Sequence, residues 1–186
     1  MEKIEWLKGS RVLIVGLGLS GIATARVLRG KVREMLITDT RGDEKMRLEA
    51  AEAGSLGAEF MAAEQAASQG GFDLVIISPG VSTDEPFVRE LRGKGSQVVA
   101  EIEVAWWLLN GRMVAITGTN GKTTTTSLVG SITGGYFTDV RVTGNIGAPL
   151  IESAEGSTEH TVFVTEVSSY QLEGIVDFKP YVSVVL

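Results

Sequence analysis

The sequence predicts an α/β protein made of two parallel-sheet units. Short apolar runs typical of buried strands alternate with segments of helical period along the whole chain. A glycine-rich turn follows a predicted strand and precedes a predicted helix twice, at residues 16–21 and 118–121. The chain of 186 residues, 44% hydrophobic and 22% charged, suffices for one large domain or two small ones. Strands joined by helical crossovers lie parallel and are buried on both faces, so we expect helices to cover each sheet.

The first half of the chain begins with an apolar run that leads into the first glycine-rich turn. The clearest strand is the run at 73–77, because the Ser78-Pro79-Gly80 turn that follows must end it. We expect strands at 11–15, 34–38, 58–61, 73–77 and 97–99, and helices at 22–28, 43–53 and 84–91.

A second series of strands and helices begins near residue 100. The segment 102–109 predicts a connecting helix in which Trp106 and Trp107 pack against the core and an interface. We expect strands at 113–117, 139–143, 161–166 and 181–186, and a helix at 122–132. The last strand reads as buried and is followed by no turn, cap or polar tail. We therefore expect two domains, at 1–99 and 100–186, the second of them truncated.

Composition and charge exclude several classes of protein. The formal net charge is −6 and the 17 basic residues are scattered, which argues against a nucleic-acid surface. No run approaches the roughly 18 apolar residues that a membrane span needs, and the charged N-terminus does not resemble a signal peptide. The absence of Cys and the single His160 exclude a thiolate metal site and a histidine cluster. We expect a soluble, cytoplasmic protein with no nucleic-acid, membrane or obligate protein partner.

The first glycine-rich turn, Gly16-Leu17-Gly18-Leu19-Ser20-Gly21, fits the G-x-G-x-x-G pattern of dinucleotide-binding folds. Glycines let the backbone approach an anion, and the N-terminus of the following helix offers free N–H groups. Asp39 closes the second strand, where an acidic side chain can accept hydrogen bonds from a ribose or a base. Alone, the pattern favours NAD, although close packing of a helix on a strand also explains the glycines.

The second turn, Gly118-Thr119-Asn120-Gly121-Lys122-Thr123-Thr124, resembles a P-loop in which Ile116 replaces the first glycine of the strict pattern. Backbone N–H groups of such a loop surround phosphates, a lysine reaches the terminal phosphates and a threonine hydroxyl binds Mg²⁺. We therefore predict that these residues bind ATP, with Lys122 and Thr123 as catalytic residues.

Glu166 ends an apolar strand, in the position where nucleotide hydrolases place a carboxylate near the metal. Mg²⁺ prefers oxygen ligands and keeps several waters, so Thr123, Glu166 and the substrate phosphates are enough to hold it. Glu166 is therefore a predicted metal ligand and catalytic residue. The segment 143–147 follows another strand, and its Asn145 amide can reach the same cleft.

Taken together, these motifs resemble the Mur ligases of peptidoglycan synthesis. The resemblance rests on G-x-G-x-S-G, Asp39-Thr40-Arg41, Ser78-Pro79-Gly80, GTNGKTTTT from Gly118, GNIG from Gly144 and EVSSYQL from Glu166. It implies a Rossmann-like UDP-sugar-binding domain at 1–99 and the first part of a P-loop-type ATPase domain at 100–186, whose C-terminal remainder is absent. It also implies contacts with the UDP-substrate by residues of both domains: Gly18, Leu19, Ser20, Asp39, Thr40, Arg41, Ser78, Gly80 and Asn145.

The implied reaction is ATP-dependent amide formation through an acyl phosphate. The Rossmann-like start together with GNIG and SSYQL favours the family member that adds D-glutamate to UDP-N-acetylmuramoyl-L-alanine, with ATP and Mg²⁺ as cofactors. The family also needs a later histidine, a carbamoylated lysine and a C-terminal domain, so we expect this chain not to ligate alone. Three alternatives stay open: a related ligase that adds another amino acid, an NAD-dependent oxidoreductase and a P-loop regulatory ATPase.

Overall fold

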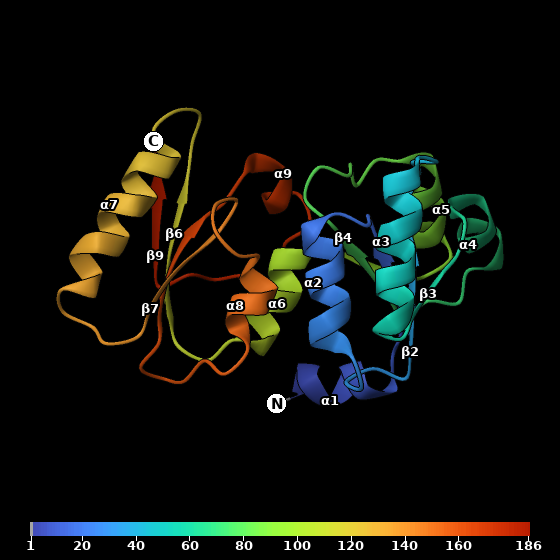
Figure 1. Cartoon of the computed structure of the whole chain (residues 1–186), viewed down its shortest axis with the longest axis horizontal. Helices are drawn as coiled ribbons and strands as arrows, with labels where there is room; N and C mark the ends of the chain where they lie inside the picture. The colour runs from blue at the N-terminus through green and yellow to red at the C-terminus, as the bar shows by residue number, and fades with distance from the viewer. Residues whose placement is uncertain (1) are drawn as a thin grey trace. The chain divides into compact units, whose positions relative to one another are not determined.

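The computed structural model describes residues 2–186. Within them the chain folds into two compact units, the first ending at Glu101 and the second running from Ile102 to Leu186. Each unit contains one parallel β-sheet with helices packed against it (Figure 1). The prediction of an α/β chain with parallel sheets is confirmed.

In the described part of the first unit, the sheet has five strands in the order β3-β2-β1-β4-β5, all parallel. The strands are β1 (Arg11–Val15), β2 (Glu34–Thr38), β3 (Ala58–Phe60), β4 (Leu74–Ile77) and β5 (Gln97–Ala100). The helices are α1 (Glu2–Gly9), α2 (Leu19–Leu28), α3 (Glu44–Ser55), α4 (Ala63–Gln69) and α5 (Pro86–Gly93). The strand order reverses between β1 and β4, which is where α/β sheets of this kind bind ligands.

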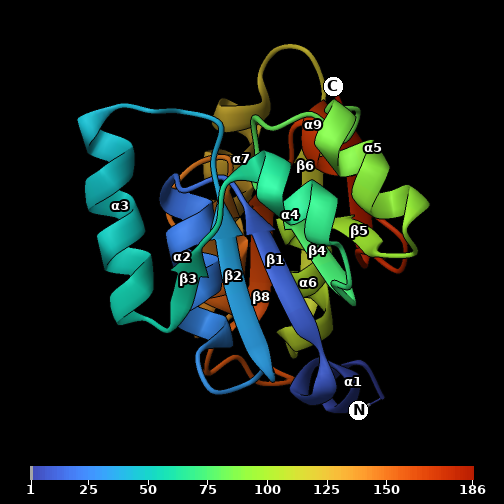
Figure 2. The ribbon, with the colours of Figure 1, turned by 90° about the vertical axis from the view of Figure 1, so that its right-hand side faces the viewer.

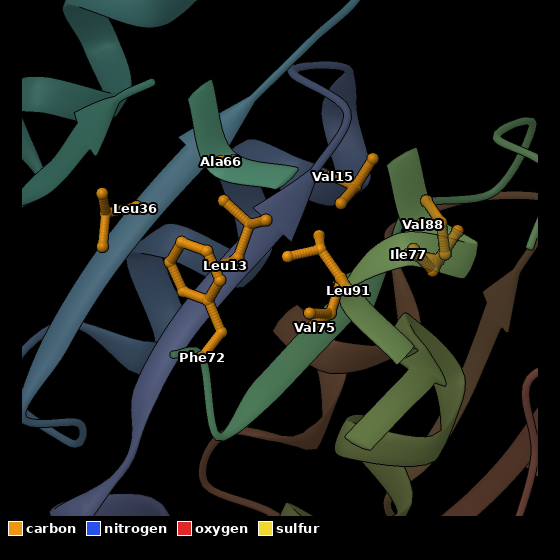
Figure 3. Packing of buried hydrophobic residues seen from close by; sticks show 9 residues of the cluster. All are labelled: Leu13, Val15, Leu36, Ala66, Phe72, Val75, Ile77, Val88 and Leu91. Carbon is orange, nitrogen blue, oxygen red and sulfur yellow. The ribbon is translucent and has the colours of Figure 1, made fainter. Parts of the chain in front are cut away.

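Helices cover both faces of this sheet. Figure 2 shows α2 behind the strands and α4 and α5 in front of them. A hydrophobic cluster fills the space between the strands and α4 and α5 (Figure 3). Its buried members are Leu13, Val15, Leu36, Ala66, Phe72, Val75, Ile77, Val88 and Leu91. Because burying one large apolar side chain stabilises a fold by about 1.5–3 kcal/mol, this cluster holds β1, β2 and β4 in place.

In the described part of the second unit, four parallel strands lie in the order β7-β8-β6-β9. The strands are β6 (Arg112–Thr117), β7 (Val140–Gly144), β8 (Val162–Glu166) and β9 (Val182–Val185). The helices are α6 (Glu101–Leu108), α7 (Lys122–Gly134), α8 (Leu150–Ala154) and α9 (Ser169–Leu172). Helix α7 packs on one face of this sheet, over a cluster built on Ile116, Val162 and Val164, and α6 and α8 lie on the other (Figure 1).

Several elements differ from the sequence-based expectations. Helices α1, α4, α8 and α9 were not predicted, because with four to eight residues each they span too few turns to show a helical period. Helix α2 begins at Leu19 rather than at residue 22, so part of the glycine-rich turn belongs to its first turn. No helix in residues 2–186 has both the length and the apolar character needed to cross a membrane.

The expectation of a buried strand at 181–186 was wrong in one respect. A strand forms at Val182–Val185 and pairs with β6, but most of its side chains are exposed, with Val185 at 78%. This strand is at the edge of the sheet, where one side has no neighbouring strand within the described residues. The apolar run therefore forms the predicted strand, whose side chains are mostly exposed among the described residues.

Two buried threonines at opposite ends of β8 should respond in opposite ways to replacement by valine. The Thr165 hydroxyl is buried with no hydrogen-bond partner, whereas Thr161 Oγ1 donates to Asp139 Oδ2 at 2.6 Å and accepts from the Thr158 N–H at 2.8 Å. We expect Thr165→Val to raise the free energy of unfolding by about 1 kcal/mol, and Thr161→Val to lower it by about 1–3 kcal/mol. Urea unfolding of both variants measures the difference, and an equal loss of stability in the two would contradict it.

Candidate nucleotide- and substrate-binding sites

A pocket of about 490 Å³ opens at the carboxyl ends of β1, β2 and β4 in the first unit. It lies at the point where the strand order reverses. Its lining comes from the loops after these three strands and the start of α2: Gly16, Gly18, Leu19, Ser20, Asp39, Thr40, Arg41, Ser78, Pro79, Gly80 and Val81. Every first-unit residue that the resemblance implied for the UDP-substrate therefore lines one pocket.

The start of α2 gives this pocket an anion-binding wall. Gly18 is the N-cap residue and makes no side-chain capping bond, and no acidic residue occupies the first turn. The first N–H groups of a helix lack intrahelical partners and carry the positive end of the helix dipole. Gly21 is required by packing, because a Cβ there would lie 1.8 Å from the Gly16 carbonyl oxygen, but Gly18 has open space around it.

Asp39 joins two of the loops around the pocket. One carboxylate oxygen, Oδ2, accepts from the Leu17 N–H at 2.8 Å and from Arg41 Nη2 at 2.9 Å. The other, Oδ1, accepts from the Arg41 N–H at 2.9 Å and from Arg41 Nε at 3.0 Å. Burial by itself raises the pKa of Asp39, but the hydrogen bonds from Arg41 and Leu17 outweigh it and hold the pKa below its ordinary value. The carboxylate thus faces protein donors rather than the open pocket.

Two further contacts hold the rim of the pocket. Arg41 Nη2 also donates to Glu49 on α3 at 2.6 Å, and the hydrogen bonds to Asp39 and Glu49 raise the pKa of the guanidinium. The hydroxyl of Ser78 donates to the Gly16 carbonyl at 3.2 Å and so links the loops after β4 and β1. Glu49 was not predicted from the sequence, since nothing in its position on α3 marks it as a partner of the loop.

The P-loop-like turn of the second unit runs between β6 and α7. Gly121 is the N-cap residue of α7 and has a left-handed backbone conformation, and Lys122 is the first helical residue. The Lys122 ammonium donates to the Gly118 carbonyl at 2.9 Å and to the Thr119 carbonyl at 3.4 Å. Ile116, which replaces the usual first glycine, lies fully buried inside β6. The remaining predicted residues of this turn, Thr119, Asn120 and Thr124, are exposed.

Glu166 is hydrogen-bonded to two other predicted site residues beside this turn. Its Oε2 accepts from the Thr123 hydroxyl at 2.8 Å, and its Oε1 accepts from Asn145 Nδ2 at 3.1 Å. The residue is only 2% exposed. The Asn145 N–H also donates to the Glu166 carbonyl at 2.9 Å, and Gly144 must lack a side chain, because a Cβ there would lie 2.2 Å from that carbonyl oxygen.

Oxygen ligands suited to Mg²⁺ are present in this second site. Thr123 and Glu166 offer a hydroxyl and a carboxylate whose oxygens lie 2.8 Å apart, and hard Mg²⁺ prefers such ligands together with waters and phosphates. No group of three or more His, Cys, Asp or Glu residues that could hold a metal occurs among residues 2–186. Thr123 and Glu166 are therefore the residues here that fit the ion, as part of a shared shell with phosphate.

One local structural feature near Glu166, a helix capping box, was not predicted from the sequence. Ser168 and Gln171 form a capping box at the start of α9, in which each side chain bonds the backbone N–H of the other residue. The signal was available, because Ser followed three residues later by Gln matches the capping-box pattern. It was overlooked because α9 has only four residues.

Fold and candidate sites together define a two-unit α/β protein, with a glycine-rich turn at a strand-order reversal and a P-loop-like turn beside a strand-end carboxylate. Comparison with known families identifies its class further. Residues 10–100 match the N-terminal domain of MurD-like Mur ligases, and residues 116–186 match the Mur ligase middle domain. The chain belongs to the Mur ligase family.

Its relatives include two curated UDP-N-acetylmuramoylalanine–D-glutamate ligases. The chain is 40% identical over 183 residues to the one from Alkaliphilus metalliredigens, and 41% identical over 182 residues to the one from Clostridioides difficile. Each alignment covers 97% of this chain and 40% of the relative, so the chain spans about 40% of their length.

A solved structure shares the fold. It is the UDP-N-acetylmuramate:L-alanyl-gamma-D-glutamyl-meso-diaminopimelate ligase from Neisseria meningitides, with a TM-score of 0.50 and 15% identity. The match covers 87% of this chain and 55% of that one.

The hydrogen-bonded Asp39 carboxylate should stabilise the first unit in a pH-dependent way. A depressed pKa in the folded state means stabilisation that is present above the unfolded pKa of about 3.9 and is lost as the pH falls through the folded pKa. We expect Asp39→Asn to lower the urea midpoint at pH 7, and the difference from the unchanged protein to shrink below about pH 4. Asp84→Asn, which removes an exposed carboxylate of the same unit, is the control and should leave the midpoint at pH 7 unchanged. If the difference in urea midpoint between Asp39→Asn and the unchanged protein stays constant down to pH 3, the Asp39 carboxylate is not the origin of the stabilisation.

Proposed function

We propose that this chain forms the UDP-sugar-binding domain and the first part of the ATP-binding domain of an ATP-dependent amide ligase. The reaction is the addition of D-glutamate to UDP-N-acetylmuramoyl-L-alanine, a step in the synthesis of peptidoglycan precursors. The observation that carries the proposal is the buried Glu166 carboxylate at the P-loop, hydrogen-bonded to Thr123 and Asn145, in a chain about 40% identical to ligases of that name. ATP and UDP-sugars are nucleotides of the cytoplasm, which is where we place the protein.

The first-unit pocket supports a UDP-sugar better than NAD. In dinucleotide-binding folds, the acidic residue after the second strand accepts hydrogen bonds from a ribose hydroxyl. Here the Asp39 carboxylate already accepts four hydrogen bonds, from Leu17 and Arg41. We propose that the α2 N-terminus with Gly18, Leu19 and Ser20 holds the diphosphate. In the same proposal, the loops after β2 and β4 (Asp39, Thr40, Arg41, Ser78 and Gly80) hold the rest of the ligand, with Asp39 acting by positioning Arg41.

In the second unit we propose phosphoryl transfer from ATP to the substrate carboxylate. The carboxylate of the L-alanyl end attacks the γ-phosphorus, the bond to the leaving ADP breaks, and an acyl phosphate forms. The D-glutamate amine then attacks the acyl carbon and displaces phosphate, giving the amide. A carboxylate is a poor acyl donor because its leaving group would be oxide, so phosphorylation supplies a viable leaving group.

The residues of the P-loop serve this step by position and charge. Lys122 would exchange its bonds to the Gly118 and Thr119 carbonyls for the terminal phosphates, while the loop N–H groups surround them. Thr123 and Glu166 would hold Mg²⁺, which neutralises phosphate charge when bound. A P-loop regulatory ATPase would account for this unit equally well, but it leaves the first-unit pocket without a ligand.

Removal of the P-loop lysine should separate the two binding activities. We expect Lys122→Ala to weaken MgATP binding at least tenfold, because a hydrogen bond to a charged group contributes about 1.5–3 kcal/mol. Binding of UDP-N-acetylmuramoyl-L-alanine should stay within about twofold, since this ligand is assigned mainly to the first unit. Isothermal titration calorimetry of the chain measures both affinities, with Lys179→Ala as an exposed-lysine control in the same unit.

Three outcomes of these experiments would contradict the proposal. Unchanged MgATP affinity in Lys122→Ala would show that the turn is not a phosphate site, and NADH displacing the UDP-sugar would favour an oxidoreductase. For the reaction itself, the chain can be joined to the remaining part of the Clostridioides difficile relative. ADP release that requires both the UDP-substrate and D-glutamate supports ligation, whereas release without either indicates a regulatory ATPase.

Asn145 is expected to act on the metal site through Glu166. Its amide nitrogen is bonded to Glu166, which leaves Oδ1 for a ligand such as the sugar or lactyl group. Asn145→Ala should raise the Mg²⁺ concentration needed for ATP binding about fivefold, the equivalent of one hydrogen bond of about 1 kcal/mol. Asn145→Asp should instead lower it, because a second carboxylate beside Glu166 adds negative charge that attracts Mg²⁺. A Mg²⁺ titration of fluorescent ATP binding measures this, and an unchanged midpoint in both variants would exclude the role.

A further inference from the structure

Glu103 on α6 is a buried carboxylate that the proposed reaction does not use. Its side chain is fully buried, with 0% exposure. Oε1 accepts from Trp107 Nε1 at 2.8 Å and from the Asp177 N–H at 2.7 Å. Oε2 accepts from the Val176 N–H at 2.9 Å and from the Phe178 N–H at 3.0 Å. Four uncharged N–H donors thus surround one carboxylate.

This arrangement requires that both side-chain oxygens of residue 103 accept hydrogen bonds. Burying a charge is costly unless hydrogen bonds replace its hydration, and here two donors meet each oxygen. Glutamine at this position has the same shape but offers one oxygen and one NH₂ group. Whichever way its amide lies, two N–H donors would face NH₂ and lose their acceptor.

The three backbone donors lie in the segment between α9 and β9. Helix α9 begins at Ser169, three residues after Glu166, and Glu166 is bonded to Thr123 and Asn145. The Ser168–Gln171 capping box fixes the start of that helix. At the rear, Glu103 holds residues 176–178, and the ring of Trp106 packs edge-on against Phe178 with centroids 5.7 Å apart. The segment 167–178 is therefore fixed at both ends.

We propose that Glu103 is a positioning residue for the P-loop site. It holds the C-terminal end of the segment 167–178 against α6. This keeps Glu166, the residue before the segment, directed at Thr123 and Asn145. Only the expected effect of Glu103 on MgATP binding rests on the proposed function. The anchoring of the segment is a property of the chain itself.

Glu103→Gln tests the proposal by hydrogen exchange on the whole chain. We expect amide exchange to accelerate at least tenfold at residues 176–178 and also at α9 and at Asn145, whose N–H donates to the Glu166 carbonyl. Thr161→Val is the control for general loss of stability, because it weakens the same unit at the other end of β8 and should not single out α9. Acceleration confined to 176–178, with α9 and Asn145 unchanged, would overturn the proposal.

A milder variant keeps the test decisive if Glu103→Gln does not fold. Trp107→Phe removes one of the four donors and leaves the three backbone donors in place, so the same pattern of exchange should appear at smaller amplitude.

A second experiment measures nucleotide binding. Glu103→Gln should raise the Mg²⁺ midpoint for ATP binding about threefold to tenfold, whereas Thr161→Val should leave this midpoint unchanged. Equal midpoints in the unchanged chain and Glu103→Gln would overturn the positioning role. No MgATP binding by the unchanged chain would instead overturn the proposed function, and the exchange pattern still decides the anchor.

Discussion

In-register pairing of parallel strands is the constraint on which both sites depend. In the first unit, Val15 pairs with both Thr38 and Ile77, so the next residues, Gly16, Asp39 and Ser78, begin three loops at one edge of the sheet. In the second unit, Glu166 pairs with both Ile116 and Gly144. A slip of one residue would turn Glu166 to the opposite face and separate it from Thr123. The apolar strand residues that fix the register are therefore as necessary to each site as the polar residues at the strand ends.

The two cations of the sites are held in different ways, and the difference fits different ligands. Arg41 is bonded to two carboxylates, Asp39 and Glu49, so little of its charge is left for an anion. An anion in that pocket depends on the N–H groups at the start of α2. Within residues 2–186, the Lys122 ammonium donates to carbonyl oxygens of its own loop, which do not cancel its charge. A full positive charge stabilises the negative charge that develops while a phosphoryl group is transferred. A diphosphate that is bound without reacting has less need of it.

The α/β class and most strands could be predicted from the sequence because buried parallel strands are continuous apolar runs. The resemblance to a family implied that Gly18, Asp39 and Ser78 share one ligand, and they line one pocket because they follow β1, β2 and β4, which are neighbours in the sheet; their roles toward a ligand stay predictions. Other features depend on packing and could not be predicted. Helix α4 has almost no large apolar residue, the exposure of β9 follows from its edge position, and the partners of Asp39 and Glu103 come from distant or unmarked parts of the chain.

Three buried or half-buried carboxylates differ in how many hydrogen bonds they accept from the protein. A carboxylate can accept about four hydrogen bonds. Asp39 and Glu103 each accept four from protein donors, and their acceptor capacity is therefore used up. Glu166 is almost as buried as Glu103 but accepts only one side-chain bond on each oxygen, from Thr123 and Asn145. The oxygens of Glu166 thus keep acceptor capacity, which supports the Mg²⁺ role that we propose for this residue.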